Sequence, residues 1–173
     1  PLEPLWALGA LVLLAVTLQD VLSRLRLPAV VGWMALSIMR ALVEAAKQGD
    51  TRAVRALLDK LDDDDSLDVN TAEADGTTAL HWAVRLDSLD VTDLLIAAGA
   101  DVNDAAPIGT STLVVAALSG HGALAAFLLE QGADPDAADA GYTALHAAVL
   151  RGDLELVTAL LAHGADPSPQ LIR

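Results

Sequence analysis

Apolar residues recur at helical spacing in three segments of the chain, and each segment is followed by a glycine. In the last of them, Leu156, Val157, Leu160 and Leu161 precede Gly164. Side chains at these spacings share one face of an α-helix. The equivalent apolar positions upstream are Val91, Leu94 and Leu95, and then Leu124, Phe127 and Leu128. Each segment therefore predicts an amphipathic helix that ends near a glycine.

A second kind of helix is predicted just before each of these segments. Thr78 and Thr143 stand where a hydroxyl caps a helix N-terminus, and the residues that follow are rich in alanine and leucine. Gly120 and Gly152 stand where that helix ends and the chain turns. Small side chains let helices pack closely, so the pattern predicts pairs of packed helices.

The helix pairs repeat at a fixed interval. Gly76, Gly109 and Gly141 are separated by steps of 33 and 32 residues, and Gly99, Gly132 and Gly164 keep the same steps. A further unit precedes them, because "ALVEAAKQGDTRAVRALL" at residues 41–58 matches "ALHAAVLRGDLELVTALL" at residues 144–161. The first helix of that unit is expected to begin near Met39. Two markers in one register indicate about three and a half repeats.

Units that open with G-x-T-A-L-H and close with L-L-x-x-G-A-D resemble the ankyrin repeat, over residues 39–173. Ala79 and Ala144 replace the proline usual in that motif. The resemblance implies an all-α solenoid of helix-turn-helix units with protruding β-turn fingers. It also implies that the imidazoles of His81 and His146 tie neighbouring units together by hydrogen bonds.

Composition narrows the possible functions. The 173 residues are 54% hydrophobic but only 3% aromatic, which suits a core of alanine, leucine and valine. The chain has no cysteine, so disulfides and thiolate chemistry are excluded. A net charge of −14 disfavours binding to nucleic acid and anionic lipid, since phosphate binding relies on lysine and arginine. A basic or apolar protein partner is favoured.

The sequence predicts neither catalysis nor a bound cofactor. His81, His121, His146 and His163 all fall at structural positions of the repeat, without the carboxylates or spacing of a metal site. The run "DKLDDDDSL" at residues 59–67 places Asp62, Asp64, Ser66 and Glu73 at the ligand spacing of a calcium loop. Leu67 stands where such a loop needs glycine, so an elongated acidic loop is favoured, with weak cation association left open.

Residues 1–38 are predicted to form a separate apolar, helical segment, and residues 39–173 the repeat domain, incomplete at its C-terminal end. Residues 4–19 carry no charge, but a membrane-spanning helix needs about 20 apolar residues. As a leader peptide the segment lacks a charged start and a small-x-small cleavage site. The segment fits neither description fully. Its charge-free run still favours contact with a membrane, which is expected through residues 4–39.

Two resemblances bear on this segment. Residues 5–36 resemble the opening segment of monovalent cation:proton antiporters, without the later helices that carry transport. The repeats are similar to exported bacterial ankyrin proteins, in which "DGTTALHWA" units follow a leader. One interpretation is a membrane-associated or exported protein, whose Arg24 and Arg26 would mark the cytoplasmic side. The other is a cytoplasmic protein that begins at Met39.

The ankyrin resemblance points to a protein–protein interaction module whose concave face binds the partner. We define the helix-end row as Arg85, Leu86, Leu118, Ser119, Leu150 and Arg151. We define the finger row as Asp75, Thr77, Ile108, Thr110, Asp139 and Tyr142. The leucines predict an apolar contact patch with Tyr142 and Ile108 above it, unless they complete the helix packing instead. The alternative function is that of a fragment whose activity lies in a missing C-terminal region.

The C-terminal end of the stack is expected to be partly open. The chain stops at "GADPSPQLIR", where another finger begins, and no helix pair follows. Terminal repeats normally present a polar outer face. We expect Leu145, Val149 and Leu160 to lie on an uncovered apolar face.

Overall fold

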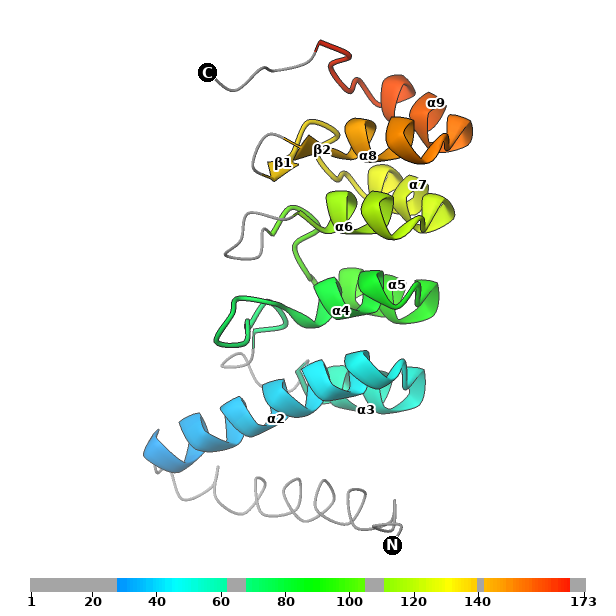
Figure 1. Cartoon of the computed structure of the whole chain (residues 1–173). Helices are drawn as coiled ribbons and strands as arrows, with labels where there is room; N and C mark the ends of the chain where they lie inside the picture. The colour runs from blue at the N-terminus through cyan, green and yellow to red at the C-terminus, as the bar shows by residue number, and fades with distance from the viewer. Residues whose placement is uncertain (1–27, 62–67, 105–110, 140–141, 169–173) are drawn as a thin grey trace, which may run out of the picture.

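The computed structural model describes residues 28–61, 68–104, 111–139 and 142–168. These residues form four helix pairs that stack one upon the next (Figure 1). The pairs are α2 (Pro28–Gln48) with α3 (Thr51–Leu61), α4 (Ala79–Arg85) with α5 (Leu89–Ala97), α6 (Thr112–Ser119) with α7 (Gly122–Glu130), and α8 (Ala144–Arg151) with α9 (Leu154–Ala162). The predicted all-α solenoid is confirmed.

Extended fingers project from one side of the stack between successive pairs (Figure 1). In the last finger, β1 (Ala138–Asp139) pairs antiparallel with β2 (Tyr142–Thr143). Because each finger leads directly into α4, α6 or α8, these helices begin beside the fingers and run away from them.

The predicted helix caps are present. Thr78 and Thr143 are N-cap residues of α4 and α8, and each forms a capping box with the histidine three residues later. His81 Nδ1 lies 2.8 Å from Thr78 Oγ1, and His146 Nδ1 lies 2.9 Å from Thr143 Oγ1. These contacts fasten each histidine to the N-cap of its own helix. The tie between units that the resemblance implies stays a prediction.

The first helices of the last two pairs end at the predicted glycines. Gly120 and Gly152 adopt φ values of 85° and 71°, in the left-handed region where a side chain is disfavoured. Asp87 occupies the same position after α4, with φ of 56°. Aspartate tolerates this conformation better than most residues, so the turn keeps its shape without glycine.

The first helix differs from the prediction. α2 begins at Pro28 rather than near Met39, and it runs without a break across the expected boundary between residues 38 and 39. Proline suits the first helical position because its fixed φ is already helical and its missing N–H would have no partner there. The division of the chain at residue 38 stays a prediction.

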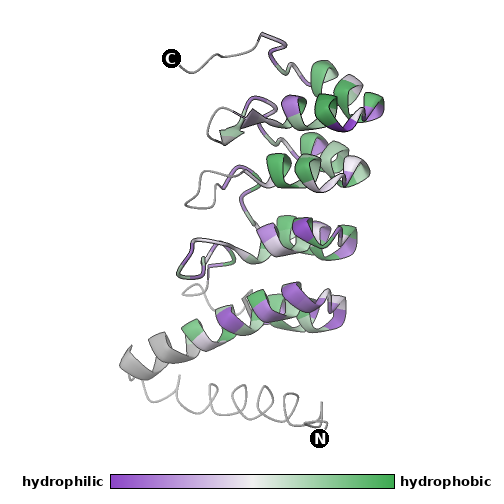
Figure 2. Cartoon of the chain, viewed as in Figure 1, coloured by the Kyte–Doolittle hydropathy of each residue, from purple (hydrophilic) through white to green (hydrophobic). Residues whose placement is uncertain are grey.

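The core runs the length of the stack and consists mainly of alanine, leucine and valine. Val84, Leu95, Leu113 and Leu128 are among its most deeply buried side chains. Hydrophobic residues dominate α6 to α9, and hydrophilic residues are more prominent on the first two pairs (Figure 2). Small residues such as Ala83, Ala116 and Ala148 are completely buried, which lets neighbouring first helices approach closely.

Across the described ranges, no helix combines the length and the apolar character needed to cross a membrane. The charge-free run at residues 4–19 and the acidic run at residues 62–67 lie outside the described residues. In the part of the chain that the structure describes, no group of three or more histidine, aspartate or glutamate side chains is arranged to hold a metal ion.

Candidate functional site

The helix-end row lies where α4, α6 and α8 end. Because α4 packs on α6 and α6 packs on α8, these ends form a file along the stack. Leu86, Leu118 and Leu150 are all exposed, and so are Arg85, Ser119 and Arg151. The leucines therefore do not complete the helix packing, which was the alternative interpretation of these residues.

Two residues of this region bind the turn of the preceding unit. Arg151 Nη1 donates a hydrogen bond to the carbonyl oxygen of Leu118 over 3.1 Å. His121 Nε2 lies 3.2 Å from the equivalent carbonyl oxygen, that of Arg85, and its Nδ1 lies 3.5 Å from Asp87 Oδ2. Helix C-termini leave carbonyl groups without partners, and a cationic side chain there is favourable. In each contact, a side chain of the later unit thus provides a partner for a carbonyl group at the helix end of the earlier unit.

The finger row is described only in part. Ile108 and Thr110 lie outside the described residues, and so does the side chain of Asp139. Asp75 Oδ1 accepts a hydrogen bond from the backbone N–H of Thr77 over 3.0 Å, and this bond lowers the pKa of Asp75. Tyr142 is half-exposed, and its ring lies 5.5 Å from that of His146.

The two rows stand at opposite ends of the first helices. Tyr142 precedes α8, whereas Leu150 lies in its last turn, and the helical stretch from Ala144 to Leu150 alone rises about 9 Å at about 1.5 Å per residue. The half-buried side chains of Trp82 on α4 and Val115 on α6 belong to the helices between the rows. Tyr142 and the leucines therefore do not form one compact patch. They lie on opposite edges of a broader surface, with the finger row along one edge and the helix-end row along the other.

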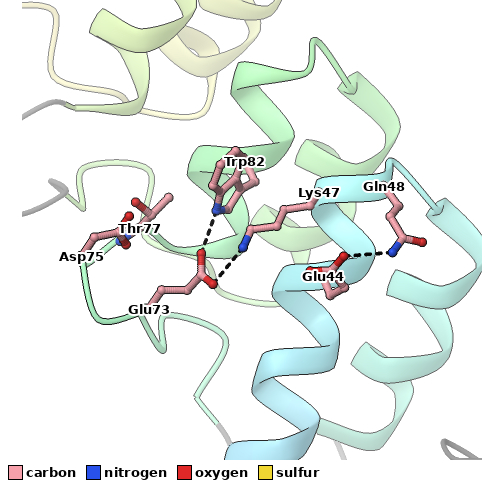
Figure 3. A network of polar contacts seen from close by, with 7 residues as sticks. All are labelled: Glu44, Lys47, Gln48, Glu73, Asp75, Thr77 and Trp82. Atoms are coloured by element: carbon pink, nitrogen blue, oxygen red, sulfur yellow. Dashed lines mark hydrogen bonds and ion pairs between the residues drawn. The ribbon is translucent and has the colours of Figure 1, made fainter. Parts of the chain in front are cut away.

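A cluster that sequence reasoning missed joins the first two units (Figure 3). Lys47 Nζ on α2 donates to Glu73 Oε1 over 2.8 Å, and Trp82 Nε1 donates to Glu73 Oε2 over 3.0 Å. Lys47 Nζ also lies 4.8 Å from the Trp82 ring centroid, and the Arg85 guanidinium lies 5.6 Å from it. These are favourable cation–π distances.

Hydrogen bonding in the cluster favours the ionised form of Glu73. The hydrogen bond from Lys47 is the main cause that lowers the pKa of Glu73, and the bond from Trp82 adds to it. The repeat alignment contained one signal for this cluster, because Lys47 aligns with Leu150 and so extends the helix-end row into the first unit. Glu73, expected as a calcium ligand only under the disfavoured interpretation, is instead paired with Lys47.

A ladder of side chains links the bases of successive fingers. Asn70 Oδ1 accepts from Asp101 N over 2.8 Å, and Asn70 Nδ2 donates to Gly99 O over 3.3 Å. One repeat later, Asn103 makes the same two bonds to Asp134 N and Gly132 O. In the third copy, Asp136 Oδ1 accepts from Asp166 N over 2.7 Å, but a carboxylate has no N–H to donate.

Comparison with known proteins agrees with this architecture. The family described as ankyrin repeats (3 copies) matches residues 32–106 and 103–170. The chain belongs to the ankyrin-repeat family, and ankyrin repeats are protein–protein interaction modules.

Individual relatives share the repeats. Notch-regulated ankyrin repeat-containing protein A of Danio rerio is 34% identical over 90 residues, which are 52% of this chain and 80% of the relative. E3 ubiquitin-protein ligase Ufd4 of Drosophila melanogaster is 34% identical over 97 residues, covering 56% of this chain and 3% of the relative. Palmitoyltransferase akr1 of Schizosaccharomyces pombe is 37% identical over 65 residues, covering 38% of this chain and 10% of the relative. The likeness to these two enzymes thus spans a small part of each.

Proposed function

We propose that the surface between the finger row and the helix-end row binds a protein or peptide segment. The observation that carries the proposal is the file of exposed leucines at the ends of α4, α6 and α8. Arg85 and Arg151 flank this file and Tyr142 lies at the other edge of the surface, and arginine and tyrosine are enriched at interface hot spots. A binding segment would lie along the stack and contact several units at once.

The charge of the repeats supports a basic or apolar partner. Residues 68–168 hold fifteen aspartates and glutamates but only two basic residues, Arg85 and Arg151. A field of one sign attracts partners of the opposite sign and raises the association rate. The attraction is screened by salt, so association with a basic partner should slow as ionic strength rises.

A panel of immobilised peptides tests the surface. Apolar peptides of equal length, carrying basic, neutral or acidic flanks, are compared for capture of the purified chain. We expect capture by the apolar–basic set, and at least a roughly tenfold loss of affinity when Leu118, Leu150 and Tyr142 are replaced together by serine, about 1.4 kcal/mol or more.

A matched control removes exposed leucines elsewhere. Leu89 and Leu154 are exposed on the second helices α5 and α9, and their replacement by serine should leave capture unchanged. Equal losses in the two variants, with both melting curves intact, would show that the exposed leucines bind without regard to position. That result would refute the proposed surface.

A separate proposal concerns the N-terminal segment. The charge-free run at residues 4–19 supports membrane contact. Because α2 begins at Pro28, the truncation that tests this contact should begin there rather than at Met39. We expect the full chain to float with phospholipid vesicles and the truncated chain to stay in the aqueous fraction.

Localisation follows the outcome of that experiment. Flotation of the full chain would support membrane association, and a full chain that stays in the aqueous fraction would count against membrane contact. The other alternative, an activity in a region that follows Arg173, is a prediction for the full reading frame to test.

A further inference from the structure

One position of the repeat, near the end of each first helix, changes character along the stack. It is occupied in turn by Lys47, Arg85, Leu118 and Leu150, and we call these four residues the graded file. Its first two members are cationic, and its last two are exposed leucines. A segment that lies along the file therefore meets positive charge at one end and apolar side chains at the other.

Arg85 is the cation of this file that has no anionic partner among the described residues. Lys47 Nζ is paired with Glu73 Oε1 over 2.8 Å, whereas no ion pair of the described ranges includes Arg85, which is exposed. The neighbouring Arg151 is engaged differently, because its guanidinium binds the carbonyl oxygen of Leu118. The guanidinium of Arg85 can thus bind the carboxylate of a partner, whose two oxygens match its planar fork of N–H groups.

An aromatic ring holds this guanidinium in position. Arg85 Cζ lies 5.6 Å from the centroid of the Trp82 ring, a favourable cation–π distance. Trp82 is itself fixed, because its Nε1 donates to Glu73 Oε2 over 3.0 Å and Glu73 is paired with Lys47 (Figure 3). A side chain that is already placed loses less conformational entropy on binding. Arg85 is therefore pre-organised for a ligand.

The backbone of this region already has hydrogen-bond partners. The carbonyl oxygen of Arg85 lies 3.2 Å from His121 Nε2, and the carbonyl oxygen of Leu118 accepts from Arg151 Nη1 over 3.1 Å. Side chains rather than these carbonyl groups are thus left to recognise a partner. The chemistry that they offer is one guanidinium followed by apolar leucine side chains.

The repeat sets the spacing of the partner's contacts. α4 packs on α6 and α6 packs on α8, and packed helices lie about 8–10 Å apart. A chain in the polyproline II conformation rises about 3.1 Å per residue with about three residues per turn, so every third side chain points the same way, about 9 Å further on. One turn of such a chain matches one step from Arg85 to Leu118, or from Leu118 to Leu150.

The acidic surroundings make a single carboxylate informative. Residues 68–168 hold fifteen acidic residues and only two basic ones, Arg85 and Arg151, so a partner's carboxylate is repelled over most of this surface. Contact with Arg85 outweighs more distant charges, because salt screens interactions beyond about 8 Å. One acidic residue thus fixes the register of a segment whose flanks are basic.

We propose that the graded file binds a polyproline II segment of another protein that carries one aspartate or glutamate and, at the third and sixth residues from it, leucine-like side chains. The carboxylate binds Arg85, and the apolar side chains contact Leu118 and Leu150. The proposal rests on the proposed binding function and adds to it the chemistry of the partner and its placement along the stack.

Fluorescence anisotropy with labelled peptides tests the proposal. The peptides have basic flanks and carry Asp-x-x-Leu-x-x-Leu or the reverse order, with proline and alanine at x, and each has a matched version with asparagine in place of aspartate. We expect at least one order to bind, and its asparagine version to bind about fivefold more weakly, near the upper range for an exposed ion pair. A version with the same residues at scrambled spacing should also bind more weakly.

Substitution of Arg85 assigns the preference to one residue. Arg85→Gln should make the aspartate and asparagine peptides bind equally, and Arg85→Glu should favour a peptide with lysine at that place. The matched control, Arg55→Glu, makes the same change of charge at an exposed position of α3 and should keep the preference for aspartate. Circular dichroism checks that all three variants are folded.

The outcomes separate this inference from the proposed function. Equal binding of the aspartate and asparagine peptides to the wild type would overturn the inference and leave the proposed surface in place. A preference for aspartate that survives Arg85→Gln, or equal binding of the scrambled peptide, would overturn it as well. Failure of every apolar–basic peptide to bind would refute both the inference and the proposed function.

Discussion

Leu129 and Leu161 occupy one position of the repeat on α7 and α9, yet one is buried and the other is half-exposed. The two helices share their length and their pattern of apolar residues. They differ in what lies against them, because α9 covers α7 and no described helix covers α9. In a stack of repeats, the burial of a residue thus depends on the neighbouring unit as well as on the residue itself. Leucines at equivalent positions therefore contribute differently to stability in different units.

Leu160 was expected on the uncovered side of the last pair, together with Leu145 and Val149, but it is completely buried. Its neighbour Leu161 is exposed instead, because the next residue of a helix points about 100° away around the axis. Leu161 is thus the exposed counterpart of the buried Leu129.

The largest effect should come from shortening the buried leucine. Leu129→Ala is expected to lower the free energy of unfolding by about 2–4 kcal/mol, since it leaves a cavity between units. Leu161→Ala should cost less than about 1 kcal/mol, because water already reaches that side chain. Urea denaturation of both variants measures the difference, and equal costs would mean that Leu161 is covered in solution.

The next comparison concerns the two glycines that end α6 and α8. A methyl group on Gly120 would meet the guanidinium of Arg151, whereas one on Gly152 would meet nothing within 4 Å. Both sites have positive φ, so Gly152→Ala should cost about 1 kcal/mol through backbone strain alone. Gly120→Ala should cost about 2 kcal/mol, because Arg151 must also leave the Leu118 carbonyl.

Thermal melting distinguishes the two contributions at Gly120. If Arg151→Ala is introduced first, Gly120→Ala should cost no more than Gly152→Ala. An unchanged cost in that background would show that Arg151 does not occupy the space above Gly120.

A smaller effect is expected at the third step of the finger ladder. Asp136→Asn supplies the missing N–H, which should reach the carbonyl oxygen of Gly164 as Asn103 reaches that of Gly132. The stabilisation should be about 0.5–1 kcal/mol, a typical net value for one hydrogen bond. Asp93→Asn, at an exposed position of α5, removes one charge without this geometry and serves as the control. Equal gains in the two variants would assign the effect to charge alone.

The smallest effect concerns the pH dependence at the junction of the first two units. The pKa of Glu73 in the folded chain lies below its ordinary value of 4.5, so its ion pair stabilises the fold above that pH and is lost as the pH falls below it. Glu73→Gln should therefore be less stable than the wild type at pH 7, and the gap should close on acidification. Denaturation at a series of pH values checks this, and a constant gap would contradict it.

The repeat period predicted most of the fold because each unit carries its own local signals. Thr78, Thr143, Gly120 and Gly152 act within a few residues of themselves, and the structure confirms all four. The start of α2 was missed because the helix extends beyond the repeat pattern, to a proline that suits a first helical turn.

The site was less predictable because its contacts cross between units. The register placed Arg85, Leu118 and Leu150 in one file, and the structure exposes all three. The contacts of Trp82, however, depend on Lys47, which comes from another unit, and on Glu73, which comes from a finger. His121 and Arg151 occupy different positions of the repeat, yet they bind equivalent carbonyl groups, and a search for identical residues at a fixed interval does not find such a pair.

The direction of those two bonds has a kinetic consequence. Each runs from a later unit to the helix end of an earlier one, so α4 and α6 are completed only when the pair that follows them has folded. Local unfolding should then proceed from α9 toward α3, because the unfolding of each pair removes contacts from the helix end of the pair before it. Amide hydrogen exchange would record this as protection that falls from unit to unit toward the C-terminus, a polarity that the repeat pattern does not itself carry.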